Sequence, residues 1–586
     1  MTATTTPKST DTISRSSSSL HGLATPPLAL EAVGARPRRM QRRPTKQASY
    51  ELCNHAKAYL EGAQYASGYD FLYSLLAAGT SISTPAQPYI GFLAPPTYLA
   101  FASSLVVYPR ATTKTHSKDA KKGSDAALRY LRCVHSTIDG PAYPTIRQAF
   151  RFPEEHSRRR ARNHRSAATS LSPRAADDVQ HLAGDAANAE SLWAQAEDFW
   201  QLIGWAFNCS ILHKKRWDRW KPWLGIMLDF LEADWNFCQR RSKDEVDRDV
   251  ILQESLLWHY IIGHTATVNR ATRRRIVKAV YANASPESLK DFTEVWEKET
   301  EGPKRRKEDE QFGKVDFETG DMGGYDEDEE MHDVEEEPTD DKGSDEDCDE
   351  EGLRGAIEQL GGADAIGLRQ RLIALLTEVA LSLPDEFTTT SDFFDNVLED
   401  FIRLPSTTFK VLISTSKLSG LPHVAFCANL LLPLVSGKLP SFLYYEPTQQ
   451  QLETNLLTLK GTAQSFAMNF KISLILEQIF MYMMNQETVK ATDALREAME
   501  QGIEARQGVH GTGKGRKGNA KEELQARALL EACSERLLGM LEMLEMKEGK
   551  PAQPSNVTST DAPSFLSFGT GSPLSDAPST ETDGDD

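Results

Sequence analysis

One glycine-rich segment comes close to a phosphate-binding loop. Residues 508–515 read GVHGTGKG and match the first seven positions of a P-loop, whose backbone amides surround phosphate while its lysine reaches the terminal oxygens. The eighth position needs a hydroxyl to hold magnesium, and Gly515 has none. The segment also joins two predicted helices, whereas a P-loop follows a buried strand. We therefore interpret 508–520 as a Gly/Lys linker, and we expect no cofactor.

Cysteine and histidine offer one pair with metal-ligand spacing. Cys209 and His213 lie one helical turn apart, so both side chains could face one zinc ion. No second pair joins them, and His259 and His264 do not share a helical face. We expect Cys209 and His213 to be packing residues and no metal site. The seven cysteines are scattered without a Cys-x-x-Cys pair, which favours a reducing compartment over a disulfide framework.

A mixed basic and aromatic segment, residues 213–221, could contact nucleic acid. Bases that neutralise phosphates alternate there with tryptophans that could stack on nucleobases. The candidate contacts are Lys214, Lys215, Arg216 and Arg219. The simpler interpretation, which we favour, is that Trp217 and Trp220 enter the core while the bases extend to solvent. The nucleic-acid interpretation is strengthened if these four residues share a surface with residues 273–275, which are all arginine.

A short basic cluster indicates nuclear import. It consists of Pro303, Lys304, Arg305, Arg306 and Lys307, which follow Gly302 and lead into polar chain. Point charges and guanidinium groups in extended chain can enter the acidic grooves of an import receptor. Two further basic clusters lie at 36–43 and 158–162. We expect the protein to be nuclear.

The net charge of -18 lies almost wholly in one segment. Residues 316–351 hold 20 acidic side chains and one base, Lys342, so the other 550 residues sum to about +1. Neighbouring carboxylates repel one another and little apolar surface is present to bury, so this run should stay solvated. It is either a solubilising linker or a surface that attracts histones or other basic proteins.

The elements that would position these residues are mostly helices. Apolar side chains recur at three- and four-residue spacing through much of the chain, and strand-like alternation is scarce. No stretch approaches 18 uninterrupted apolar residues, so no membrane span is expected. We predict a mostly α fold of stacked helix pairs, for which an irregular α-solenoid is one form, interrupted by disordered charged linkers and ending in disordered termini.

The shifts in composition define the predicted organisation. A basic Ser/Thr-rich arm (1–47) precedes an N-terminal helical block (48–151), a basic linker (152–185), a Trp-rich helical block (186–297), a linker with the basic cluster and acidic run (298–352), a C-terminal helical block (353–507), the Gly/Lys linker (508–520), an amphipathic helix (521–548) and a tail (549–586). All nine tryptophans fall between Trp193 and Trp296, which predicts a concentrated core there.

These features favour a non-enzymatic interaction protein. Helix pairs supply extended surfaces, and charged segments supply contacts that salt or modification can switch. We therefore expect a nuclear scaffold, associated with chromatin or chromosomes, that binds proteins. Nucleic acid is a less favoured partner. A cytosolic helical adaptor in trafficking or translation is the main alternative, and an enzyme without a recognisable motif is the third.

Overall fold

The computed structural model describes residues 42–80, 82–84, 86–153, 181–243, 245–263, 265, 267–302, 345–418, 420–435, 446–511 and 520–550. These residues form a mostly α fold, as the apolar periodicity predicts. None of their helices is long and apolar enough to cross a membrane. The predicted import cluster lies outside the described residues, and so does most of the acidic run.

The N-terminal part combines helices with one two-stranded sheet. Strands β1 (Thr45–Gln47) and β2 (Gly91–Leu93) are parallel, with Thr45 paired to Gly91. The helices are α1 (Tyr50–Glu61), α2 (Tyr65–Ala77), α3 (Pro96–Val107), η1 (Pro109–Ala111), α4 (Lys118–Thr137), η2 (Gly140–Ala142) and α5 (Tyr143–Ala149). The predicted arm, 1–47, therefore reaches into the fold, because β1 belongs to the sheet.

The middle part contains the 28-residue helix α10 and shorter helices around the tryptophans. Its elements are η3 (Asp185–Ala187), α8 (Leu192–Gln195), α9 (Phe199–Leu212), α10 (Lys214–Arg241), α11 (Arg248–Gln253), α12 (Leu256–Ile262), α13 (Arg270–Val280) and α14 (Pro286–Asp291). All nine tryptophans are buried, the most exposed being Trp296 at 8%. The predicted tryptophan core is confirmed.

The C-terminal part is entirely helical among its described residues. It consists of α15 (Asp345–Gln359), α16 (Ala363–Ser382), α17 (Thr390–Phe401), α18 (Ser406–Ser414), α19 (Leu421–Leu431), α20 (Gln449–Gln451), the π-helical turn η4 (Leu452–Leu456), α21 (Phe466–Asn485), α22 (Asp493–Gln507) and α23 (Ala520–Lys547). Between η4 and α21, Gly461 forms an isolated bridge with Val435, and α21 begins at Phe466.

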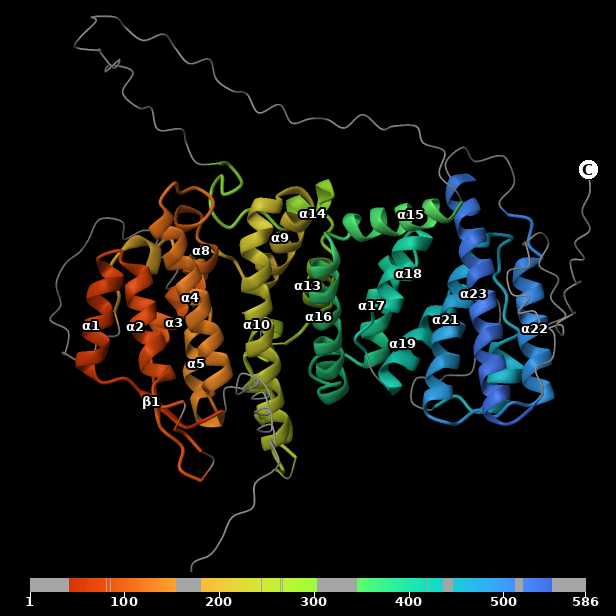
Figure 1. Cartoon of the computed structure of the whole chain (residues 1–586), viewed down its shortest axis with the longest axis horizontal. Helices are drawn as coiled ribbons and strands as arrows, with labels where there is room; N and C mark the ends of the chain where they lie inside the picture. Colours follow the sequence, from red (N-terminus) through yellow and green to blue (C-terminus); the bar gives the residue numbers. More distant parts are fainter. Residues whose placement is uncertain are drawn as a thin grey trace, which may run out of the picture.

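The helices stand side by side in a row along the long axis, from α1 at one end to α22 at the other, while α15 lies across the upper edge (Figure 1). Sequence neighbours such as α9 and α10 pack together, and so do α2 and α4 or α21 and α23. The three parts share a core. Their buried apolar side chains form one continuous cluster from Ala56 to Leu544.

Helix α10 starts earlier than its proline suggests. Pro222 fits the first turn of a helix by sequence, yet it lies inside α10, eight residues after Lys214. A proline inside a helix costs roughly 3 kcal/mol, since the carbonyl four residues earlier loses its donor. That carbonyl belongs to Asp218, an exposed residue, and Trp217 and Trp220 are buried on the preceding turns. Burial of the two indoles offsets the lost bond. The helix ends at Arg241.

Buried cations satisfy carbonyl groups at helix ends throughout the stack. Each donates to main-chain oxygens at or just beyond a C-terminus, where helices leave carbonyls without partners and carry partial negative charge. The pairs are Arg43 with Leu76 and Ala78, Arg216 with Val107, Arg369 with Val280 and Ala282, Lys471 with Ile402 and Leu404, and Arg506 with Leu457 and Leu459. Burial lowers the pKa of Arg369 to about 9 and that of Arg506 to about 10.

Candidate interaction surfaces

The predicted basic and aromatic segment contributes mainly to the core. Trp217 and Trp220 are buried, as the simpler interpretation requires. Lys214 and Lys215 are exposed, although the Lys214 ammonium caps the carbonyl of Ser210. Arg219 Nη1 donates to Asp125 Oδ1 at 2.7 Å. Only the two lysines of the four candidates therefore present charge that no neighbouring carboxylate offsets.

Arg216, the fourth candidate, is not at the surface. Its side chain is 2% exposed, and its Nη2 lies 3.3 Å from Glu299 Oε2, which is fully buried. Trp205 Nε1 donates to the other carboxylate oxygen of Glu299. Burial raises the pKa of Glu299, while the charge of Arg216 opposes that shift. Arg216 therefore cannot contact phosphate, and the predicted four-residue surface is corrected to a buried ion pair.

The arginines at 273–275 do not extend this surface either. Arg275 pairs with Asp198, the residue that caps the start of α9, at 3.0 Å, whereas Lys214 follows the end of α9. A helix of 14 residues is about 21 Å long. The two basic groups thus lie at opposite ends of α9, and the condition that would favour nucleic-acid binding at 213–221 is not met.

The chain that precedes the charged segment is held in the fold up to Gly302. Residues 298–302 were predicted to begin a linker, but Glu299 within them is held by Arg216 and Trp205 inside the core. Lys114 Nζ also donates to the carbonyl of Glu297. The chain is therefore locked in place four residues before Pro303.

The chain that follows the charged segment is fixed as well, by helix α15. Helix α15 begins at Asp345, so the end of the predicted acidic linker is helical. Ala356 and Leu360 are buried, and α15 packs on α18. Gly361, with φ of +89°, turns the chain sharply into α16. Both anchors lie along the upper edge of the stack (Figure 1).

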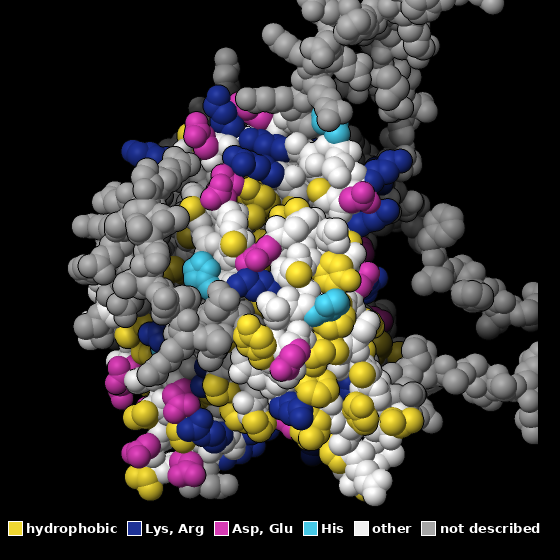
Figure 2. Space-filling model, turned by 90° about the vertical axis from the view of Figure 1, so that its left-hand side faces the viewer, with side chains coloured by type: hydrophobic (Ala, Val, Ile, Leu, Met, Phe, Trp, Pro, Cys, Tyr) yellow, Lys and Arg dark blue, Asp and Glu magenta, His cyan; other side chains and the backbone are white. Residues whose placement is uncertain are grey.

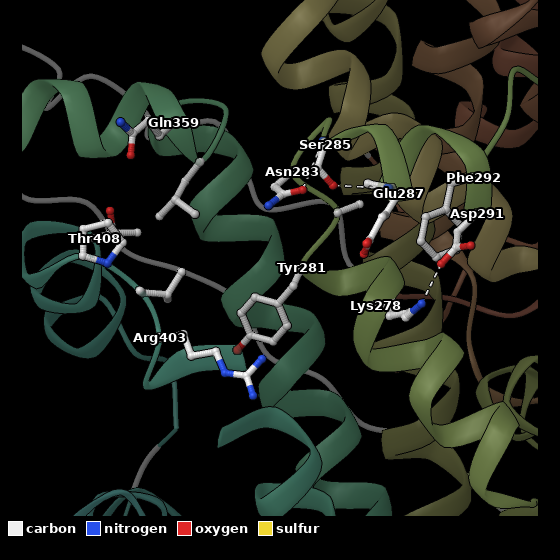
Figure 3. Close-up of a pocket in the computed structure, with 15 residues that line it drawn as sticks. Lys278, Tyr281, Asn283, Ser285, Glu287, Asp291, Phe292, Gln359, Arg403 and Thr408 are labelled. Atoms are coloured by element: carbon white, nitrogen blue, oxygen red, sulfur yellow. Dashed lines mark hydrogen bonds and ion pairs between the residues drawn. The ribbon is translucent and has the colours of Figure 1, made fainter. Parts of the chain in front are cut away.

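A cavity of about 510 Å³ opens below α15, between the middle and C-terminal parts. Figure 3 shows Tyr281 at the end of α13 directed toward Arg403, with Glu287 of α14 on the facing wall. Lys278 and Asp291 pair at 2.8 Å on its rim. The lining carries charges of both signs together with amide and hydroxyl groups. Such a lining suits a polar peptide segment better than a simple anion.

Thr408 contributes the least satisfied polar group of this cavity. Its hydroxyl is buried at the start of α18 and has no hydrogen-bond partner among the described residues. A buried hydroxyl without a partner costs free energy, which a ligand or water could restore. The cavity can therefore accept a hydrogen-bonding group.

A second groove, of about 390 Å³, runs along the last two turns of α10. It is lined by Ala233 and by five polar side chains, Arg42, Asn236, Gln239, Arg240 and Lys243, and we call these five the basic groove. The four from α10 and its C-terminal extension recur at spacings of three and four residues, so they share one helical face. Among the residues that the structure describes, no carboxylate lines the groove.

Arg42 is fixed across this groove by the fold. Its Nη1 donates to Tyr143 Oη at 2.8 Å, and the Tyr143 ring stacks on Phe237 of α10 at 5.1 Å. The next residue, Arg43, is buried, and its backbone N–H donates to Thr137 O at 2.9 Å. The main chain at Arg42 therefore has a defined position beside α10.

The N-terminal end of the stack exposes apolar side chains. They surround the β1–β2 pair and comprise Tyr50, Ile82, Tyr89 and Ile90, between 43% and 69% exposed. Figure 2 shows this end, with hydrophobic side chains gathered over its lower part. Contiguous exposed apolar area is a common feature of protein contact surfaces.

The remaining candidates from the sequence, Cys209 and His213, lie in packing contacts. Cys209 is fully buried, and burial raises the pKa of its thiol well above the ordinary value. The ring of His213 lies 6.0 Å from that of Trp205. His264 and most of the glycine-rich segment lie outside the described residues. Within the described part of the chain, no three His, Cys, Asp or Glu side chains cluster as metal ligands.

Sequence reasoning missed the basic groove. The polar residues 236, 239, 240 and 243 share one face once this segment is recognised as a helix, so the part of the groove that α10 supplies could have been predicted. Arg42 could not, because it lies almost 200 residues away in a part predicted to be an unfolded arm.

Comparison with known proteins adds no relative: no family model, no curated protein and no solved structure matches this chain.

Proposed function

We propose that this chain is a non-enzymatic nuclear scaffold, a subunit of a chromatin- or chromosome-associated complex, that presents a charged segment from a rigid helical stack. The observation that carries the proposal is the double anchoring of residues 303–344. Glu299 fixes the chain before them, and α15 fixes it after them.

Double anchoring affects what the acidic run can do. Both ends of the segment belong to one body with a continuous core, so its 17 acidic residues are tied to that body at two points. Clustered carboxylates produce a strong negative potential, which raises the association rate of basic proteins and weakens as salt is added. The import cluster at Pro303–Lys307 lies next to the first anchor in sequence, where an import receptor could bind it.

The test for partner binding is a pulldown of purified histones with the full chain across a salt series. The matched variant changes every Asp and Glu from 316 to 344 to Asn or Gln, which keeps length and removes charge. We expect strong capture by the wild type at low salt, steep loss as the Debye length falls from about 10 Å at 0.1 M to about 3 Å at 1 M, and weak capture by the variant. Equal capture by both would reduce the run to a solubilising linker.

The test for the compartment is imaging of a tagged chain with Lys304, Arg305, Arg306 and Lys307 changed to Ala. We expect the wild type to be nuclear and the variant to spread into the cytoplasm. A cytoplasmic signal from both would favour the alternative function, a cytosolic helical adaptor.

A further inference from the structure

The basic groove holds charges that the fold itself does not use. Arg241 next to it pairs with Glu254 at 2.8 Å, and Arg371 nearby pairs with Asp229 and Glu232, so most cations around α10 have carboxylate partners. Among the described residues, Arg240 and Lys243 have neither an ion pair nor a hydrogen bond to their side chains. The amides of Asn236 and Gln239 are likewise unused.

These groups are arranged to bind an extended anion. Arginine forks and side-chain amides donate to the oxygens of phosphate, and lysine adds a point charge. From Asn236 to the end of α10 at Arg241 the helix rises about 8 Å, and Lys243 lies two residues further, so these groups can contact at least two successive phosphates of one strand of a duplex. Arg42 supplies a third cation from across the groove.

The positions of the charges favour nucleic acid over an acidic protein segment. Arg36, Arg38 and Arg39 come directly before Arg42 in the sequence, so positive charge continues along the chain from the groove. Glu299, which precedes the charged segment, pairs with Arg216, and Arg216 lies about 36 Å along α10 from Arg240. The chain that leads into the acidic run is thus fixed beside the start of α10, whereas the groove lies along its last turns, and this helix runs from the upper to the lower edge of the stack (Figure 1).

We propose that the basic groove, Arg42, Asn236, Gln239, Arg240 and Lys243, binds the phosphate backbone of nucleic acid. This inference extends the proposed scaffold function by adding a second partner class, bound at the other end of α10 from the Arg216–Glu299 pair. Contacts of this kind read backbone charge and carry no base sequence. The groove therefore binds duplexes of different sequence alike.

The experiment measures binding of the full chain to a fluorescein-labelled DNA duplex of about 20 base pairs, by anisotropy between about 0.05 and 0.3 M salt. The variant Arg240→Ala/Lys243→Ala removes two cations from the groove. Each phosphate contact contributes about 0.9 to the slope of log K against log salt, so the variant should flatten that slope by about 1.8 and weaken binding about tenfold or more at 0.1 M.

The matched control is Lys214→Ala/Lys215→Ala, which removes two exposed lysines from the other end of the same helix. It should bind the duplex like the wild type. Equal weakening by both variants, or no binding by the wild type at the lowest salt, overturns the proposal. Competition by polyglutamate at lower concentration than unlabelled duplex also overturns it, because the occupant would then be an acidic polypeptide.

Two further readouts separate this proposal from other causes. Cations at the end of α10 also stabilise the helix dipole, so the melting temperature of each variant is measured, and lower stability with unchanged binding contradicts the proposal. Duplex binding by the purified chain does not depend on its compartment or on histone capture. Failure of the scaffold function and failure of the groove are therefore distinguishable.

Discussion

Arg216 Nη2 and Glu299 Oε2 lie 3.3 Å apart, and the two side chains are 2% and 0% exposed. The pair joins the start of α10 to the last fixed residues before the charged segment. It also orders its surroundings, since Trp205 donates to the carboxylate and Arg216 donates to the end of α3. A buried pair of this kind contributes little net stability over apolar replacements, yet it is costly to break.

Replacing Glu299 with Gln should destabilise the fold by about 3–5 kcal/mol, because the Arg216 charge then stays buried without a partner. The measurement is urea denaturation of the full chain. Glu531→Gln is the control, since it breaks an exposed pair in which Arg527 and Glu531 are 53% and 51% exposed, and it should cost no more than about 0.5 kcal/mol. Equal shifts in the two variants would contradict the role of the buried pair.

Six buried thiols predict a loss of stability in alkali. Burial raises the pKa of Cys238 to about 11 and that of Cys427 to about 12, and the pKa values of Cys53, Cys133, Cys209 and Cys533 also rise. Thiols in the unfolded chain titrate near 9. Above that pH the folded state keeps protons that the unfolded state loses, so their contribution is fully present below pH 9 and is lost as pH rises toward 11 or 12.

Each thiol contributes up to about 1.4 kcal/mol per pH unit in this window. Burial lowers the pKa of Lys471, Arg43, Arg369 and Arg506, and these four groups act in the opposite sense. They are outnumbered by the thiols, which buried tyrosines such as Tyr69 and Tyr260 join above pH 10. Denaturation midpoints under reducing conditions should fall steeply above pH 9. Cys427→Ala removes one of these thiols, so the free energy of unfolding of this variant should fall less steeply with pH. A free energy of unfolding that does not change above pH 9 in the wild type would contradict the prediction.

Two helical glycines should respond oppositely to alanine. A Cβ at Gly502 in α22 would lie 1.8 Å from the carbonyl oxygen of Leu457, whereas one at Gly539 in α23 would meet nothing within 4 Å. Gly502→Ala should therefore cost about 3 kcal/mol or more through displaced backbone. Gly539→Ala should stabilise by about 0.5–1 kcal/mol, because alanine loses less conformational entropy in a helix. The melting temperatures of both variants measure this difference. Similar changes in melting temperature for the two variants would contradict the prediction.

Trp235→Ala should cost about 3–5 kcal/mol, because its indole is fully buried and the cavity it leaves cannot collapse completely. Leu524→Ala is the control, with a side chain 71% exposed in α23, and it should change stability by less than about 0.5 kcal/mol. Both are followed by circular dichroism during thermal unfolding. A wild-type melting temperature for Trp235→Ala would show that the tryptophans are not a structural core.

Local patterns predicted the helices and the tryptophan core well, since periodicity and burial are properties of nearby residues. The burial of all nine tryptophans and the last helix, predicted at 521–548 and found at Ala520–Lys547, are examples. Arg216 shows the limit. Its burial depends on Glu299, which no pattern around residue 216 reveals, and arginine is rarely buried without a partner.

The same limit applies to the candidate site. The basic groove needs Arg42 placed against α10 by Tyr143, a long-range contact with no signature in either segment. The predicted boundary at 353 was late for a related reason. Acidic residues from 345 onward predict solvated chain, but α15 packs on α18, and this tertiary contact stabilises a helix that extends back to Asp345.

The continuous core implies that the covalent link between 302 and 345 is dispensable for cohesion. Arg369 holds the end of α13, Arg371 pairs with two carboxylates of α10, and Arg273 donates to the carbonyl of Phe387, so both sides of the link are joined by buried and charged contacts. A protease that cut once within 303–344 would release no fragment. The nicked protein should elute as one particle, and two separately expressed pieces divided there should reassemble into it.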